Sequence, residues 1–200
     1  MSRDDDTAKK RRLFIGTFLP VADQQRIGAL QRFNDQLASE WNYRLRWVRP
    51  DKLHLTWLFL GLVDSNLVDE VASKLGAILA DQPTLELTYT QPVIWPTPKH
   101  PRHFVLGTAS VPEDVRSLNS RIAAELKQYV HPHAEEHGTY KPHITLFRLD
   151  QGNGPINIPS WFPLGTTLPL KQRIDQIDII ESHLSGAKNY EALHSFKLKW

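Results

Sequence analysis

Apolar and polar residues follow two different periods along this chain, and each period predicts one kind of element. A period of three to four residues, typical of amphipathic helices, occurs in residues 21–41, 66–79 and 113–130. Short alternating or continuous apolar runs, typical of strands, occur in residues 13–19, 45–48, 53–60, 85–89, 103–109, 173–182 and 190–198, and from about residue 141. The proline-rich residues 95–102 predict a rigid connection, and the glycine- and proline-rich residues 151–169 a long loop.

The order of these elements favours an α+β fold. Strands outnumber helices and often follow one another directly, which predicts mainly antiparallel sheet with helices packed outside it. Because a similar short motif occurs in each half of the chain, we expect two pseudo-symmetric lobes with an active-site cleft between them. The charged residues 1–12 predict a disordered leader, and residues 13–200 a single bilobal domain.

The repeated motif reads His, apolar residue, Thr, apolar residue. Its first copy is His54-Leu55-Thr56-Trp57, and its second copy, 89 residues later, is His143-Ile144-Thr145-Leu146. Successive side chains on a strand point to opposite faces, so the His and the Thr of each copy share one face. Two such strands side by side would place two imidazoles and two hydroxyls on one surface. This set predicts acid/base chemistry on a phosphate.

The composition argues against several other kinds of chemistry. The chain has no cysteine, which excludes disulfides, thiolate metal sites and a cysteine nucleophile. No apolar run approaches the roughly 20 residues that span a bilayer, and no apolar signal region is present, so we expect a cytoplasmic protein without a membrane partner. The sequence contains no glycine-rich phosphate-binding loop followed by a lysine, so it does not indicate that the protein uses ATP. His131, His133 and His137 lie close together, but their polar, proline-containing context favours a loop over a metal site.

The paired motifs resemble those of the 2H phosphoesterase superfamily. The surrounding residues are similar to the bacterial and archaeal RNA 2′,3′-cyclic phosphodiesterases, also called 2′-5′ RNA ligases. The segments that carry this resemblance are residues 12–16, 45–56, 59–61, 140–148, 181–182 and 190–191. Trp57 is bulkier than the residue usual there, and the 151–169 loop is a second departure. Neither departure touches a catalytic position, but both bear on substrate preference.

The resemblance implies hydrolysis of an RNA-terminal 2′,3′-cyclic phosphate to a 2′-phosphate, without a metal or a cofactor. It also implies ATP-independent 2′-5′ ligation as the reverse reaction. By resemblance His143 is the proton acceptor and His54 the proton donor; the residues alone do not separate these roles. Thr56 and Thr145 would donate hydrogen bonds to phosphate oxygens. Arg148 matches a substrate-binding arginine, and its odd spacing from His143 predicts a strand end or a bulge that turns it to the site face.

An anionic substrate also suits the distribution of basic residues. The net charge is only +2, but basic residues gather before the first motif, in the middle of the chain and around the second motif. These three groups are Arg44, Arg46, Arg49 and Lys52; Lys99, His100, Arg102 and His103; and Lys141 and Arg148. The expected partners of a monomeric protein are therefore RNA ends that carry the cyclic phosphate, including tRNA fragments, or small cyclic nucleotides.

Two alternatives stay open at this point. The first is a phosphodiesterase for small cyclic nucleotides or 2′-5′ oligonucleotides, which would use the same catalytic pair. The second is a non-catalytic RNA-binding module whose aromatic side chains stack on bases. The aromatic candidates are Trp47, Trp95, Phe104 and Tyr140. Turnover distinguishes the enzymes from the binding module, and activity on nucleotides of different length distinguishes the two enzymes.

Overall fold

A computed structural model describes residues 9–132, 139–183 and 190–200. The strands in these ranges are β1 (Lys10–Phe18), β2 (Arg44–Trp47), β3 (His54–Asp64), β4 (Leu85–Tyr89), β5 (Gln91–Thr97), β6 (His100–Gly107), β7 (His143–Asp150), β8 (Leu170–Ile174), β9 (Gln176–Ser182) and β10 (Tyr190–Lys197). The α-helices are α1 (Val21–Gly28), α2 (Asn34–Trp41), α3 (Val68–Leu79) and α4 (Glu113–Leu126). The short 3-10 helices are η1 (Ala29–Phe33), η2 (Pro50–Lys52), η3 (Ser65–Leu67), η4 (Lys127–Tyr129) and η6 (Leu164–Thr166).

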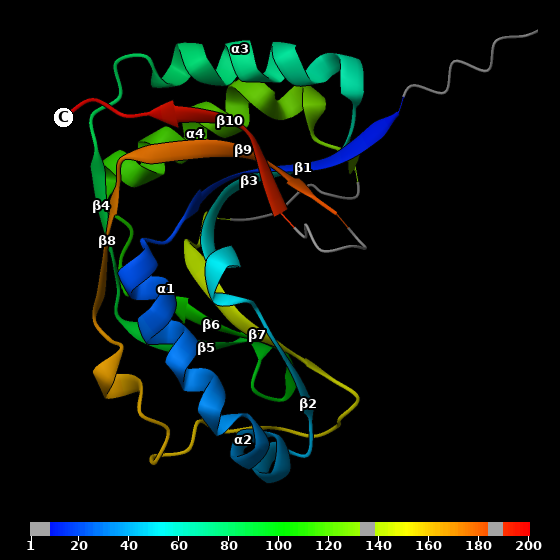
Figure 1. The fold of residues 1–200 in the computed structure, drawn as a ribbon, viewed down its shortest axis with the longest axis vertical. Helices are drawn as coiled ribbons and strands as arrows, with labels where there is room; N and C mark the ends of the chain where they lie inside the picture. The colour runs from blue at the N-terminus through cyan, green and yellow to red at the C-terminus, as the bar shows by residue number, and fades with distance from the viewer. Residues whose placement is uncertain (1–8, 133–138, 184–189) are drawn as a thin grey trace, which may run out of the picture.

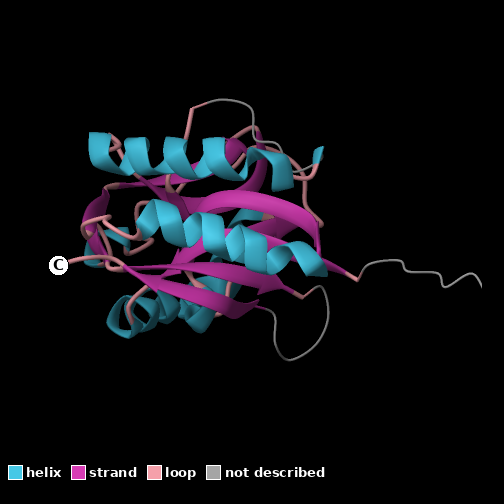
Figure 2. Cartoon of the chain, turned by 90° about the horizontal axis from the view of Figure 1, so that it is seen from above, coloured by secondary structure: helices cyan, strands magenta, loops and turns pink. Residues whose placement is uncertain are grey.

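One eight-stranded sheet organises the fold. Its strand order is β10-β9-β1-β3-β7-β6-β5, with β2 also paired to β7, while β4 and β8 form a separate two-stranded sheet. Every pairing between these named strands is antiparallel. Helices lie outside the strands on more than one side (Figure 2). The structure therefore confirms the predicted α+β class and its mainly antiparallel sheet.

The sheet has two halves that meet where β3 pairs with β7. One half, β10-β9-β1-β3, carries α3 and α4, which lie together at the top of Figure 1. The other half contains β7, β6, β5 and β2, with α1 and α2 beside it. The buried hydrophobic residues of both halves form one connected core. No helix in the described ranges has the length and apolar character needed to cross a membrane.

The helices follow from the spacing of their apolar residues. In α3 the buried residues Val68, Val71, Leu75 and Leu79 recur every three or four positions, so they form one apolar stripe that packs into the core. Asp69 and Glu70 lie in the first turn of this helix, where negative charge stabilises the positive end of the helix dipole. In α4 the buried residues have the same spacing. The predicted helix 21–41 consists of three successive helical segments, α1, η1 and α2.

Two strands extend further than their composition predicts. β1 begins at Lys10, so the last three residues of the predicted leader belong to the sheet, and residues 1–8 lie outside the described residues. Pairing with β3 orders this charged segment: Lys10 lies across from Asp64, and the Arg12 guanidinium lies 4.7 Å from the ring centre of Phe59. β3 does not end at Gly61, which has φ 78° at a register shift and lets the strand continue to Asp64.

Two predicted segments divide differently in the structure. The proline-rich residues 95–102, predicted as a rigid connection, form the facing ends of β5 and β6 and the short turn at Pro98 and Lys99 that joins these strands. β5 and β6 form this hairpin at the edge of the sheet, where a proline costs little because one side of the strand needs no hydrogen-bond donor. The predicted strand 173–182 is two strands, β8 and β9, which pair in different sheets.

Candidate active site

The two His-containing motifs meet in the middle of the large sheet. Leu55 of β3 pairs with Ile144 of β7, and both side chains are fully buried. This antiparallel register, continued by one residue each way, sets His54 across from Thr145 and Thr56 across from His143. All four of these side chains are half-buried and share the face opposite the core. The structure therefore brings together the two histidines and two threonines that the sequence singled out.

Both histidines are held in the same way. The Nδ1 atom of His54 lies 2.7 Å from the carbonyl oxygen of Lys52, and Nδ1 of His143 lies 2.9 Å from that of Lys141. A carbonyl oxygen only accepts hydrogen bonds, so Nδ1 carries the proton in each neutral ring and Nε2 is the unprotonated nitrogen. Sequence analysis missed this contact. The acceptor is a backbone carbonyl, which every residue carries, so no residue type in the sequence could have pointed to it.

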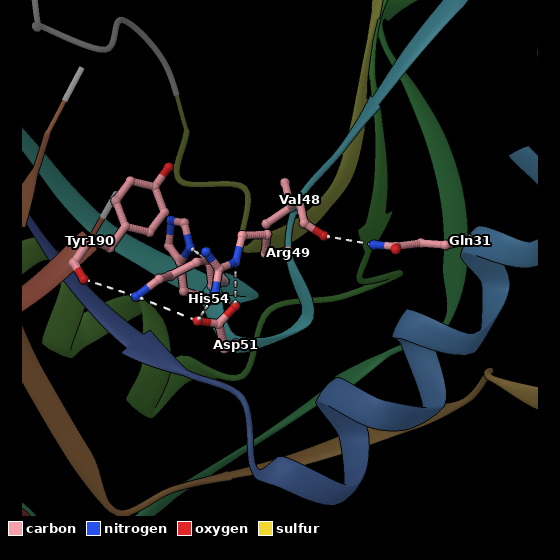
Figure 3. A network of polar contacts seen from close by, with 7 residues as sticks. Gln31, Val48, Arg49, Asp51, His54 and Tyr190 are labelled. Atoms are coloured by element: carbon pink, nitrogen blue, oxygen red, sulfur yellow. Dashed lines mark hydrogen bonds and ion pairs between the residues drawn. The ribbon is translucent and has the colours of Figure 1, made fainter. Parts of the chain in front are cut away.

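Aromatic rings surround His54. Its ring centre lies 4.8 Å from that of Phe14 and 5.2 Å from that of Tyr190, which meets it edge-on. Figure 3 shows Tyr190 beside His54, close to the Arg49–Asp51 ion pair. Burial lowers the pKa of His54 from 6.5 to about 4; the Lys52 carbonyl opposes this shift, and nearby His143 adds to it. His54 is therefore neutral at pH 7 in the ligand-free protein.

His143 has a different neighbour. The Trp95 ring lies 4.2 Å from it between ring centres, at an angle of 56°. Trp95 comes from β5 and pairs with His103 of β6, which in turn pairs with Arg148 of β7. Burial lowers the pKa of His103, the adjacent positive charge of Arg148 lowers it further, and the nearby His143 acts in the same direction. A third histidine thus lies on the site face, beside the two that the motifs predict.

A register shift in β7 brings Arg148 to the site face. Phe104 and Val105 of β6 pair with Phe147 and Thr145, so Leu146 is left unpaired as a bulge. Leu146 and Phe147 are consequently both buried, and the exposed Arg148 follows on the face of the histidines. This confirms the irregularity predicted from its odd spacing. Among the described residues, Arg148 makes no hydrogen bond or ion pair.

A matching register shift lies in β3 at Trp57. Ile15 and Gly16 of β1 pair with Leu58 and Thr56, so the residue that corresponds to Leu146 is again skipped. The bulky Trp57 side chain is buried in the core, and its Nε1 donates a hydrogen bond to Thr17 Oγ1 at 3.0 Å. The large Trp57 side chain therefore lies in the core and does not reach the face that carries the histidines. The two motifs share a bulge as well as a residue pattern.

The sequence of the chain also matches a known protein family. The sequence profile of the 2′-5′ RNA ligase superfamily matches residues 19–186. The chain belongs to this superfamily. The membership confirms the resemblance to the 2H phosphoesterases that the paired motifs suggested.

The individual proteins that resemble this chain have low sequence identity to it. A Bacillus subtilis (strain 168) protein named RNA 2′,3′-cyclic phosphodiesterase is 26% identical over 157 residues, which cover 76% of this chain and 80% of the relative. The crystal structure of apo E. coli LigT has a TM-score of 0.72 at 21% identity and covers 96% of this chain and 99% of its own. The crystal structure of TT0787 of Thermus thermophilus has a TM-score of 0.69 at 21% identity, covering 94% and 98%. These structures share the fold.

A basic pocket of about 410 Å³ adjoins the superfamily motifs on the side of His54. Its lining residues are Arg12, Arg46, Trp47, Val48, Arg49, Lys52, Arg148, Ser182, His183 and Tyr190. Three of the four basic residues noted before the first motif are among them. The second basic group divides, since Lys99, His100 and Arg102 line a separate pocket. Sequence analysis noted Arg12, Ser182 and Tyr190 only within segments similar to the family, and it did not predict that β1, β9 and β10 form a wall beside the motifs, because only the fold brings them there.

The aromatic candidates for base stacking have different environments. Phe104 is fully buried, and Trp47 packs against Phe147 with its Nε1 bonded to Asn34. The Tyr140 hydroxyl donates to the Thr56 carbonyl oxygen at 2.9 Å. Trp95 is half-buried beside His143. Of the closely spaced histidines, His133 and His137 lie outside the described residues, and within the described ranges no group of three metal-ligating side chains occurs.

Proposed function

We propose that this protein hydrolyses an RNA-terminal 2′,3′-cyclic phosphate to a 2′-phosphate by a two-histidine mechanism that needs no metal. One observation carries the proposal: the Leu55–Ile144 pair places both motifs on one face, in opposite directions. A phosphate above this pair would have one imidazole at each end and one hydroxyl at each side. In-line displacement at phosphorus requires a base on the side of the nucleophile and an acid on the side of the leaving oxygen.

Each residue then has a defined task. The neutral His143, with its proton on Nδ1, takes a proton from water at Nε2 while water attacks phosphorus. Protonated His54 supplies a proton from Nε2 to the 3′ oxygen as its bond to phosphorus breaks. The hydroxyls of Thr56 and Thr145 donate to the non-bridging oxygens, and the Arg148 guanidinium balances their charge. These groups provide both proton transfers and the charge stabilisation that the reaction needs.

The protonation of His54 depends on the substrate. Its pKa of about 4 in the ligand-free protein leaves it neutral at pH 7, which is the wrong state for an acid. A bound cyclic phosphate adds a negative charge beside the ring and offsets the positive charge of Arg148. Opposite charge favours the protonated imidazole, so substrate binding raises the pKa of His54. His54 is then protonated, and able to act as an acid, only in the complex.

The comparisons support the proposed substrate class. The chain belongs to the 2′-5′ RNA ligase superfamily, and the Bacillus subtilis relative is named an RNA 2′,3′-cyclic phosphodiesterase. We also propose a ligation, in which an RNA 5′-hydroxyl takes the place of water: it gives its proton to His143 and attacks phosphorus while the 3′ oxygen leaves with the proton of His54, so that a 2′-5′ linkage forms without ATP. The half-buried Trp95 at the site is compatible with base stacking in either reaction.

The decisive experiment incubates the protein with an RNA that ends in a 2′,3′-cyclic phosphate, in excess EDTA. The expected product is the same RNA with a phosphomonoester in place of the cyclic phosphate. An RNA that ends in a 3′-hydroxyl is the control. Loss of activity in EDTA that is restored by a divalent ion would reject the metal-independent mechanism. Binding of both RNAs without any turnover would instead identify an RNA-binding module. Adding a second RNA with a 5′-hydroxyl tests for ligation.

A further inference from the structure

The bulges in the two motifs are held in different ways. A bulge leaves one residue of its strand unpaired in the ladder, so the peptide groups beside it need other partners. In the second motif the skipped residue is Leu146, whose carbonyl oxygen accepts a hydrogen bond of 2.8 Å from the backbone N–H of Val48. In the first motif the skipped residue is Trp57, whose carbonyl oxygen accepts a hydrogen bond of 2.6 Å from the Asn119 side chain. The first bulge therefore depends on a particular side chain, whereas a backbone N–H is common to all residues except proline.

A second side chain holds the neighbouring carbonyl of the first bulge. The Tyr140 hydroxyl donates to the Thr56 carbonyl oxygen, one residue before the carbonyl that Asn119 holds. Tyr140 comes from the segment before the second motif, and Asn119 comes from α4, which packs against β3. The two carbonyls belong to the peptide units on either side of Trp57, so both ends of the bulge are fixed.

Thr56 is the site residue that this bulge carries. Its side chain is branched at Cβ, so χ1 is restricted and the direction of the hydroxyl follows the backbone. The held carbonyl is attached to the same Cα, so fixing it also limits how the side chain can tilt. We infer that Tyr140 and Asn119 are positioning residues, which aim the Thr56 hydroxyl at the phosphate through the backbone of the bulge. This inference rests on the proposed function, in which that hydroxyl donates to a non-bridging oxygen.

The Tyr140 bond also joins the two halves of the site. β3 and β7, both described along their whole length, pair at one position only, Leu55 with Ile144. The bond from Tyr140 to Thr56 is a further connection between the segments that carry the two motifs. The Tyr140 ring stacks on the Trp57 ring, with 6.1 Å between ring centres and 18° between planes. This packing stays when only the hydroxyl is removed, so Tyr140→Phe tests the hydrogen bond by itself.

The test measures kcat on an RNA that ends in a 2′,3′-cyclic phosphate, in three backgrounds. Removing a whole donor to a developing negative charge costs about 10²–10³-fold in kcat. Tyr140→Phe loosens such a donor without removing it, so we expect a loss of about tenfold in the natural protein. In a Thr56→Val background the same change should cost less than about twofold, because the hydroxyl that Tyr140 aims is gone. In a Thr145→Val background the full loss should remain.

Tyr43→Phe is the matched control. The Tyr43 hydroxyl donates to the Gly154 carbonyl oxygen at 2.8 Å, which is the same kind of bond at a place outside both motifs. This variant should keep the natural kcat, and thermal unfolding checks that every variant is folded. Asn119→Ala is the second test variant, since alanine suits the helix α4, and its loss should depend on Thr56 in the same way. If Tyr140→Phe does not fold, Asn119→Ala decides the question.

Several results would overturn the inference. An equal loss in all three backgrounds would mean that Tyr140 supports the fold or His143 rather than Thr56. An unchanged kcat in either test variant, or a tenfold loss in Tyr43→Phe, would also reject the positioning role. If the natural protein turns over no cyclic phosphate, the proposed function fails. Binding of inorganic phosphate, followed by phosphorus NMR, then decides the positioning role: a loss of affinity in Tyr140→Phe that disappears in the Thr56→Val background supports it, and any other pattern rejects it.

Discussion

His54 should make the folded protein sensitive to mild acid, and this effect can be measured without any substrate. Its pKa is lowered from 6.5 to about 4 in the folded state, mainly by burial. Below pH 6.5 the unfolded chain therefore binds a proton at this residue that the folded chain does not. The contribution to stability is complete above the unfolded pKa and is lost as the pH falls toward the folded pKa.

The size of the effect follows from the two pKa values. Between pH 7 and pH 5 the titration of His54 should lower the free energy of unfolding by about 2 kcal/mol. His54→Asn removes this titration, and the amide can still donate to the Lys52 carbonyl as Nδ1 does. The loss of stability between pH 7 and pH 5 should therefore be about 2 kcal/mol smaller in the variant, by urea denaturation at each pH.

Two further measurements make this result specific. His100→Asn removes an exposed imidazole from β6 and controls for the chemical change itself. NMR titration of the labelled imidazoles reports the folded-state pKa of His54 directly. Parallel pH dependences in His54→Asn and the natural protein, or a measured His54 pKa near 6.5, would show that burial does not hold this ring neutral, and the argument for loading the acid by substrate would fail with it.

Three other predictions concern catalysis. His54→Ala and His143→Ala should each lower kcat by about 10²–10⁴-fold with unchanged circular dichroism, and the double variant should lose less than the product of the two, because both act in one step; wild-type rates in either would remove the paired mechanism. The descending alkaline limb of the pH profile should lie at higher pH for kcat than for kcat/KM, since the bound phosphate raises the pKa of His54; coincident limbs would contradict substrate loading. The product should be the 2′-phosphate, identified by phosphorus NMR against authentic isomers, and a 3′-phosphate would mean that the ribose lies the other way round.

Much of the site could be predicted because its information is local. Four neighbouring residues determine which side chains share a face, so each His–Thr pair followed from strand alternation alone. Even the bulge before Arg148 was predictable, since a regular strand would have turned that residue away. The same reasoning did not find the bulge at Trp57, because no residue beyond it had to reach the site.

The rest depends on contacts between distant parts of the chain. Arg12 bonds to Ser182, 170 positions away, and no local pattern connects them. The charge of Arg12 even favoured a disordered leader, whereas pairing with β3 makes it a wall of the basic pocket. The prolines of β5 concealed a strand in the same way, because an edge position tolerates what a central strand does not. His103 was noted only as part of a basic group, since the sheet register alone places it beside Arg148.

The Leu55–Ile144 pair gives the centre of the site a local two-fold axis, as in any antiparallel ladder. The trigonal bipyramid formed during in-line phosphoryl transfer has a matching symmetry, with the entering and departing oxygens at its two apices. In the proposed mechanism the centre is therefore equally suited to both directions of the displacement. Which oxygen enters depends on whether water or a ribose hydroxyl occupies the apex at His143. Only the surroundings of the centre break this symmetry, with the basic pocket on the side of His54 and Trp95 beside His143.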